Sequence, residues 1–371
     1  MREITPWFNE STYIAPLSPA CEMCANGSKL VVLITGLCPA KCFYCPLSLE
    51  KGGKDRIFAD EWELDNENDI AKLINEAKYI DATGAGITGG DPLVVWKRTK
   101  NYISLLKDIF GADFHIHLYT SGVKNGKHIH DLVSAGLDEI RFHPTPKHWG
   151  DMNKSPITHA IKTALETNID VAIEIPSMPK MDQEMFSLVE WANYMGINWI
   201  NLNELEYSER NAEDLNHRDY SVKDDISAAV TGSQESANNV LTMVVDEDFE
   251  IGVHYCSSSF KDGIQLTNRI KRRAKNVVKD HEVISDDGTL LKGIIYTKNM
   301  SLQELYKTIK QEFNVEDEYI FLNGEKKRIE LGLWILEKIS PELKERGLEC
   351  YMIEEYPTAD GLEVERIPLP L

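Results

Sequence analysis

Between residues 29 and 204, short apolar runs alternate with stretches whose apolar residues recur at helical spacing. This alternation predicts a parallel β-sheet with right-handed crossover helices. The number of units favours a curved sheet or partial barrel over a closed eightfold barrel. The predicted strands are 29–36, 84–90, 113–120, 139–144, 169–176 and 198–204, and the predicted helices are 69–78, 99–110, 127–135, 156–166 and 183–195.

The later strands of this region have one apolar and one polar face. In the third strand, Ile116 and Leu118 alternate with His117 and Tyr119. Parallel strands that are covered on both faces are apolar on both, and a closed barrel fills its interior with Val, Ile and Leu. We therefore expect helices against the apolar face and a polar interior that is open to a ligand.

The chain on either side of this region follows other patterns. A polar, acidic insertion covers 208–248 with one helix expected near 224–241, and a further strand at 249–255 leads to Cys256. A small α+β domain follows, with expected strands at 290–297, 349–354 and 362–367 and expected helices at 302–313 and 327–346. We divide the chain into an irregular N-terminal segment (1–28), a partial barrel with a C-terminal extension (29–279) and the α+β domain (280–371).

The net charge excludes some partners. Asp and Glu number 60 and Lys and Arg 40, which gives −20. A field of this sign repels nucleic acid unless basic residues gather locally. The basic run at 269–275 lacks an aromatic platform for bases and is interpreted as the solvated end of a helix. No run approaches the roughly 18 apolar residues that span a bilayer, and no signal-peptide pattern opens the chain, so we expect a cytoplasmic protein.

Five of the seven cysteines lie between Cys21 and Cys45. Such a cluster in a cytosolic protein indicates metal ligands rather than disulfides. Cys38, Cys42 and Cys45 have the spacing CxxxCxxC directly after the first predicted strand. Three thiolates on one loop can bind three irons of a cubane cluster and leave the fourth iron open to a chelator. Zinc is the competing interpretation, but zinc prefers paired CxxC units with a fourth protein ligand.

This loop resembles the signature of the radical S-adenosylmethionine (radical SAM) superfamily. The second predicted strand ends in Gly89-Gly90-Asp91-Pro92, where these enzymes have a Gly-Gly-Glu-Pro-like turn that meets the amino group of SAM. Asp91 is one methylene shorter than Glu, whereas backbone contact through Gly89 and Gly90 is unaffected. The resemblance covers residues 29–204 and is nearest to the activating enzymes of pyruvate formate-lyase and their archaeal relatives.

The resemblance implies an α/β fold, a partial (βα)6 radical SAM barrel. It implies that Cys38, Cys42 and Cys45 bind a [4Fe-4S] cluster whose open iron is chelated by SAM, with Tyr44 against the cofactor. An electron from the cluster would cleave SAM to methionine and a 5′-deoxyadenosyl radical. An electron donor such as ferredoxin or flavodoxin and anaerobic conditions are further implications.

Other cofactor-binding candidates stand at the ends of later strands, because ligands bind at the carboxyl ends of parallel strands. They are Thr120, Ser121, Glu174 and Asn203, with His143 as a further residue of the interior. For each of them alone, a structural polar role is an equal alternative.

A second group of cysteines lies outside the signature. Cys21 and Cys24 form a CxxC unit, and His254 and Cys256 stand far away in the sequence. These ligand types suit zinc or an auxiliary iron–sulfur cluster. The alternative is that the cysteines are buried small apolar residues, which is our interpretation of Cys350.

The sequence thus predicts a radical SAM enzyme that abstracts hydrogen from a protein or peptide, docked by the C-terminal domain. One alternative is an enzyme that modifies an RNA nucleoside, which the net charge disfavours. The other is a non-catalytic metal-binding interaction protein.

Overall fold

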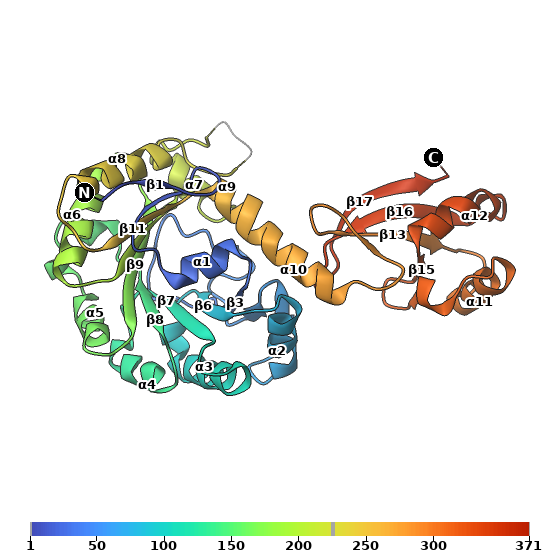
Figure 1. Cartoon of the computed structure of the whole chain (residues 1–371), viewed down its shortest axis with the longest axis horizontal. Coiled ribbons are helices and arrows are strands. Elements are labelled where there is room, and N and C mark those ends of the chain that lie inside the picture. The colour runs from blue at the N-terminus through green and yellow to red at the C-terminus, as the bar shows by residue number, and fades with distance from the viewer. Residues whose placement is uncertain (1, 224–226, 371) are drawn as a thin grey trace. The chain divides into compact units, whose positions relative to one another are not determined.

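The computed structural model describes residues 2–223 and 227–370 (Figure 1). The chain forms two compact units. The first consists of Met1–Lys78 and Ala82–Leu266, and the second of Tyr79–Asp81 and Thr267–Leu371. None of the helices in the described part of the chain combines the length and the apolar composition that a membrane span requires.

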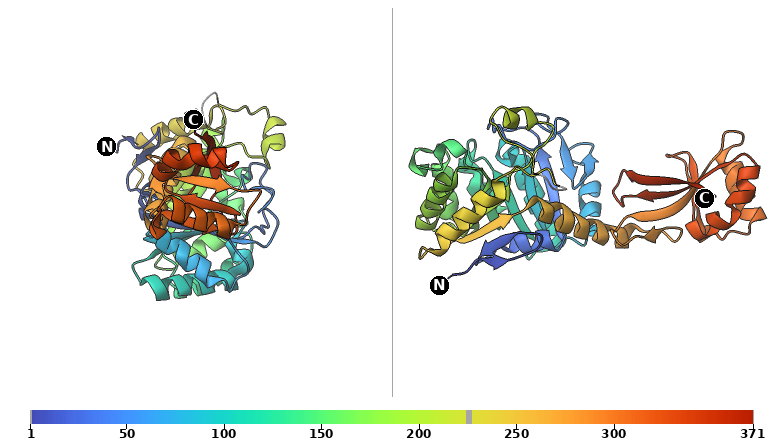
Figure 2. Two further views of the ribbon diagram at one scale, coloured as in Figure 1. Left: turned by 90° about the vertical axis from the view of Figure 1, so that its right-hand side faces the viewer. Right: turned by 90° about the horizontal axis from the view of Figure 1, so that it is seen from above.

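A curved, mainly parallel sheet forms the first unit, and its helices lie on the outside of the strands (Figures 1 and 2). The strand order within the described residues is β1-β2-β11-β10-β9-β8-β7-β6-β3-β4-β5. The strands β4 (Ile57–Ala59) and β5 (Trp62–Leu64) form an antiparallel edge beside β3. The parallel strands are β3 (Lys29–Thr35), β6 (Gly84–Gly89), β7 (His115–Thr120), β8 (Glu139–Phe142), β9 (Asp170–Ser177), β10 (Trp199–Glu204) and β11 (Gly252–Cys256). The predicted α/β architecture is confirmed.

The crossover helices bury one apolar face against this sheet. In α3, Tyr102, Ile103 and Leu106 recur at helical spacing and are buried, whereas the opposite face is charged. The helices are α2 (Ile70–Tyr79), α3 (Trp96–Phe110), α4 (Ile129–Ser134), α5 (Thr158–Leu165), α6 (Asp182–Tyr194) and α8 (Ser233–Val245). The last is the helix expected near 224–241; residues 224–226 of that range lie outside the described residues.

The N-terminal segment is regular, and its description as irregular is wrong. It contains β1 (Thr5–Pro6), β2 (Thr12–Ile14) and α1 (Pro19–Ala25). Ser18 begins α1 because its hydroxyl accepts a hydrogen bond from the Ala20 amide, and Pro19 stands in the first turn, where its missing N–H costs nothing. In addition, β2 pairs antiparallel with β11 and so extends the sheet. Figure 1 shows α1 across the interior of the curved sheet, where it contacts β3 and β6.

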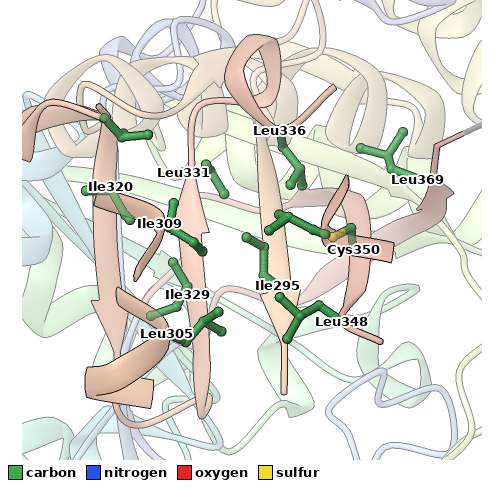
Figure 3. Packing of buried hydrophobic residues seen from close by; sticks show 12 residues of the cluster. Ile295, Leu305, Ile309, Ile320, Ile329, Leu331, Leu336, Leu348, Cys350 and Leu369 are labelled. Atoms are coloured by element: carbon green, nitrogen blue, oxygen red, sulfur yellow. The ribbon is translucent and has the colours of Figure 1, made fainter. Parts of the chain in front are cut away.

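An antiparallel sheet in the order β14-β15-β13-β16-β17, with β12 beside β13, forms the second unit. Its strands are β12 (Val283–Ile284), β13 (Leu290–Tyr296), β14 (Ile320–Asn323), β15 (Arg328–Leu331), β16 (Glu349–Glu355) and β17 (Glu363–Leu369). Helices α11 (Leu302–Glu312) and α12 (Leu333–Glu345) cover one face, and their apolar side chains form a core with those of the strands (Figure 3). Cys350 is part of this core, as predicted.

The prediction of a single long helix at 327–346 is wrong for its first residues. Residues 328–331 form β15, which pairs with β13 and β14, and α12 begins only at Leu333. Arg328 and Glu330 are buried in this strand and form an ion pair. Charged residues at these positions would be expected on the exposed face of a helix, so the sequence pattern does not predict their burial. Long-range strand pairing therefore overrides local helix propensity here.

The basic run at 269–275 is only partly solvated. It lies on α10 (Thr267–Val277), where Arg273 is buried against the ring of Tyr79. Arg272 donates to the carbonyl oxygens of Ile80 and Asp81 at 2.7 and 2.8 Å. These carbonyls follow the end of α2, and a cation stabilises such a helix terminus. The interpretation of the run as a solvated helix end is therefore wrong for these two arginines.

Candidate active site

A cavity of about 480 Å³ occupies the interior of the curved sheet in the first unit. Its walls come from the polar faces and carboxyl ends of the parallel strands, as the alternation in the sequence predicts. The cavity brings together most of the site residues predicted from the sequence: Cys21, Cys24, Cys38, Cys42, Tyr44, Cys45, Gly89, Gly90, Thr120, Ser121, His143, Glu174, Asn203, His254 and Cys256.

The loop of Cys38, Cys42 and Cys45 leaves β3 and forms one wall of the cavity. Its base is closed because the Gly36 amide donates to the Lys54 carbonyl at 2.8 Å. A Cβ atom at Gly36 would lie 1.8 Å from the carbonyl oxygen of Lys51, so only glycine fits this closure.

All three thiols of the loop are free; Cys38 as a whole residue is exposed, whereas its thiol is partly buried at the cavity. Burial raises the pKa of Cys38 to about 11 and raises the pKa of Cys42. The apoprotein therefore holds these two groups as neutral thiols near pH 7, and metal binding must release their protons.

The turn after β6 is fixed against the start of the cysteine loop. The Gly90 amide donates to the Thr35 carbonyl at 2.7 Å, and the Asp91 amide donates to the Leu37 carbonyl at 2.8 Å. Gly89 has a φ of +136°, and a Cβ at Gly90 would lie 2.3 Å from the Leu37 oxygen. Both glycines are therefore required by close backbone contact, and both also face the cavity.

The Asp91 side chain points into the protein and does not line the cavity. Its carboxylate accepts hydrogen bonds from the Leu93 amide at 3.0 Å, from Thr120 Oγ1 at 2.7 Å and from Ser121 Oγ at 2.5 Å. Burial raises the pKa of Asp91, and these hydrogen bonds oppose that effect. Asp91 thus holds Thr120 and Ser121 at the cavity wall from behind.

Tyr44 and His143 form a second fixed pair at the cavity. The Tyr44 hydroxyl lies 2.9 Å from His143 Nε2, and His143 Nδ1 lies 2.6 Å from the Glu174 carbonyl oxygen. Since a carbonyl only accepts, Nδ1 carries the proton. Burial lowers the pKa of His143, so the ring is neutral and Nε2 accepts from the Tyr44 hydroxyl.

The Glu174 carboxylate is the centre of a hydrogen-bond network. Arg141 Nη1 donates to its Oε2 at 2.8 Å, Asn201 Nδ2 to the same oxygen at 3.1 Å, and Asn203 Nδ2 to Oε1 at 2.9 Å. Burial disfavours the charged form, but the Arg141 guanidinium, the hydrogen bond from Asn203 and the charge of Lys29 together outweigh burial and lower the pKa of Glu174. The carboxylate is therefore ionised and oriented at the cavity wall.

Sequence reasoning missed several polar residues of the cavity. Arg141 is buried and also donates to Glu139 Oε1 at 2.5 Å. Lys29 Nζ lies 3.1 Å from His117 Nε2, and Lys261 Nζ lies 2.6 Å from Glu206 Oε1. Arg141 could have been found, because it stands on the polar face of the alternating pattern in β8. Lys29 is the first residue of β3, and no sequence pattern marks it as a cavity residue.

The second cysteine group lines the same cavity, from α1 and the end of β11. Within the part of the chain that the structure describes, neither cysteine group has three ligand atoms within 4.8 Å of one another. Three ligands of one zinc ion at about 2.3 Å would lie closer together. Three free thiols on one loop at the cavity wall are the donor set that a cubane cluster takes, one thiolate for each of three irons.

Comparison with known proteins identifies the family. A model of the radical SAM superfamily matches residues 32–192. A protein of Methanocaldococcus jannaschii, MJ0021, whose name assigns it provisionally to the glycyl-radical enzyme activating enzymes, is 38% identical over 365 residues, covering 95% of this chain and 93% of that protein. The chain belongs to the radical SAM superfamily. It is therefore an enzyme, and the non-catalytic alternative is set aside.

Other similarities of this radical SAM protein are narrower. The GTP 3′,8-cyclase of Nitrobacter winogradskyi is 26% identical over 184 residues, which cover 45% of this chain and about half of that enzyme. Residues 288–369 match a domain of unknown function, DUF8061. Streptococcus suis SuiB bound to S-adenosylmethionine matches with a TM-score of 0.43 and 12% identity over 62% of this chain and 50% of SuiB. Membership of the superfamily implies a [4Fe-4S] cluster and SAM, and the donors at the cavity suit both.

Proposed function

We propose that this radical SAM enzyme is an activating enzyme that generates a glycyl radical in a partner protein. The full-length similarity to the M. jannaschii protein carries this proposal, because it extends over both units of the chain. The net charge of −20 supports a protein rather than an RNA substrate.

The residues of the cavity suggest how the cofactors would be held. Cys38, Cys42 and Cys45 would bind the [4Fe-4S] cluster, and the backbone of Gly89 and Gly90 would approach the amino acid part of SAM. When bound at these residues, the cluster and SAM would supply the radical chemistry that removes a hydrogen atom from a glycine Cα of the partner protein.

Other side chains would position SAM. The hydroxyls of Thr120 and Ser121, oriented by Asp91, and the Glu174 carboxylate with Asn203 offer hydrogen-bond partners for SAM hydroxyl and amino groups. Tyr44, held by His143, would lie against the cofactor. The enclosed interior would keep water from the radical.

An external electron donor, a ferredoxin or flavodoxin, would reduce the cluster in the cytoplasm under anaerobic conditions. The exposure of Cys38 supports this, because it brings the edge of the cluster site to the surface.

The test follows a hydrogen isotope. Reconstituted enzyme with dithionite and SAM is mixed with the protein fraction of a native-host extract from cells grown on glycine deuterated at Cα. We expect deuterium in the 5′-deoxyadenosine. This deuterium should disappear when the extract is first treated with protease and should remain when the extract is first treated with ribonuclease. The variant with Cys38, Cys42 and Cys45 all changed to Ala is the control and should give none. Release of 5′-deoxyadenosine without deuterium, or sensitivity to ribonuclease, would contradict the proposal.

A further inference from the structure

Three cysteines outside the signature line one cavity inside the first unit. Cys21 and Cys24 lie on α1, and Cys256 ends β11, more than two hundred residues later. The three line one cavity, and Cys256 shares a small buried apolar cluster with Ala25, the residue after Cys24. The fold therefore joins a CxxC unit to a remote cysteine.

His254 belongs to the same place. It lies two residues before Cys256 on β11, so both side chains point to the same face of the sheet, toward the cavity. Its side chain is 3% exposed, and neither ring nitrogen has a hydrogen-bond partner. A buried imidazole with both nitrogens unsatisfied is costly, and an iron bound to one of the two nitrogens would reduce that cost.

The strand register brings Cys21 near this imidazole. Asn201 of β10 is the register partner of His254, and neighbouring strands lie about 4.8 Å apart. Cys21 Sγ lies 3.5 Å from Asn201 Nδ2. Cys21 and His254 thus both lie beside the Asn201 amide.

The sulfurs already have donors of the kind that cluster thiolates accept. Arg141 Nη2 lies 3.7 Å from Cys21 Sγ, and Gln265 Nε2 lies 3.8 Å from Cys256 Sγ. Hydrogen bonds of this kind to the ligand sulfurs tune iron–sulfur centres.

From these contacts we infer that Cys21, Cys24, Cys256 and His254 bind a second iron–sulfur cluster, distinct from that of the Cys38 loop. Within the described residues, no three of these ligand atoms lie within 4.8 Å of one another, as three ligands of a single zinc ion would, so we choose a cluster over zinc. The inference does not depend on the identity of the substrate.

Iron content tests the inference on the intact protein. After anaerobic reconstitution with iron and sulfide, the parent chain should hold about eight iron atoms, two cubane clusters of four. The triple variant Cys21→Ala, Cys24→Ala, Cys256→Ala should hold about four, and so should Cys38→Ala, Cys42→Ala, Cys45→Ala. Cys350→Ala, in the core of the second unit, is the matched control and should keep the parent content.

The ligand His254 has its own signature. In the Cys38 loop variant, pulsed electron paramagnetic resonance of the reduced second cluster should show coupling to a ¹⁴N nucleus, which His254→Ala removes. About four irons in the fully reconstituted parent, or one zinc per chain at the second group, would overturn the inference. So would a Cys38 loop variant that is folded by circular dichroism and holds no iron.

Discussion

The hydroxyl of Tyr44 lies 2.9 Å from Nε2 of His143, which joins the cysteine loop to the carboxyl end of β8. A neutral histidine is needed for this bond, since Nδ1 is committed to the Glu174 carbonyl. The loop residue that precedes Cys45 is thus fixed by a residue from the opposite part of the sheet.

Loss of this bond should loosen SAM binding without removing the cluster. We expect Tyr44→Phe to keep the iron of the Cys38 loop and to weaken SAM binding about two- to twelvefold, since one neutral hydrogen bond contributes about 0.5–1.5 kcal/mol. SAM titration of the reconstituted protein measures this. Tyr194→Phe, on the exposed end of α6, is the matched control. Unchanged SAM affinity in Tyr44→Phe would contradict the role given to the pair.

The turn Gly89–Gly90 should matter for assembly of the cysteine loop itself. A Cβ at Gly90 would collide with backbone atoms of Leu37, one residue before Cys38, so Gly90→Ala should displace the loop. We expect the variant to lose most of the iron bound at Cys38, Cys42 and Cys45. Gly150→Ala, where a Cβ meets nothing within 4 Å, should bind iron like the parent. A Gly90→Ala protein with full iron content and weakened SAM binding would show instead that the turn serves only the cofactor.

Asp91 offers a comparison with the longer acid of the family motif. Its carboxylate is fully buried against Thr120 and Ser121, so Asp91→Glu adds a methylene to a filled site. Overpacking of this kind costs about 1–3 kcal/mol. We expect a lower free energy of unfolding and no gain in SAM affinity, measured by urea unfolding and SAM titration. Tighter SAM binding by Asp91→Glu would mean that this carboxylate reaches the cofactor.

The order of strands and helices in the first unit could be predicted because the spacing of apolar residues within each segment differs between strands and helices. The cysteine loop and the Gly-Gly turn could be predicted because their chemistry is local in sequence. The role of Asp91 could not, since it depends on Thr120 and Ser121 from the next strand. For the same reason β15 was missed: the burial of Arg328 depends on Glu330 and Glu355, and Glu355 belongs to a distant strand.

His117 should make the stability of the apoprotein depend on pH. The side chain is fully buried, and burial, reinforced by the charges of Lys29 and Arg141, lowers its pKa well below 6.5. A histidine with a depressed pKa in the folded state favours unfolding when it is protonated. The contribution of the neutral His117 to the free energy of unfolding is therefore fully present above about pH 6.5. It is lost as the pH falls below that value, at up to about 1.4 kcal/mol per pH unit.

The measurement is the thermal midpoint of the apoprotein at about pH 7.5 and pH 5.5, either side of the ordinary histidine pKa. We expect the midpoint to fall at the lower pH and to fall less in His117→Gln, which keeps an acceptor for Lys29 Nζ, now 3.1 Å from Nε2. His148→Gln is the matched control, because that histidine lies in a surface turn after β8, and it should leave the fall unchanged. If the thermal midpoint falls equally in the parent and in His117→Gln, the acid sensitivity comes from other groups, because the variant has no imidazole at position 117 to take up a proton on unfolding.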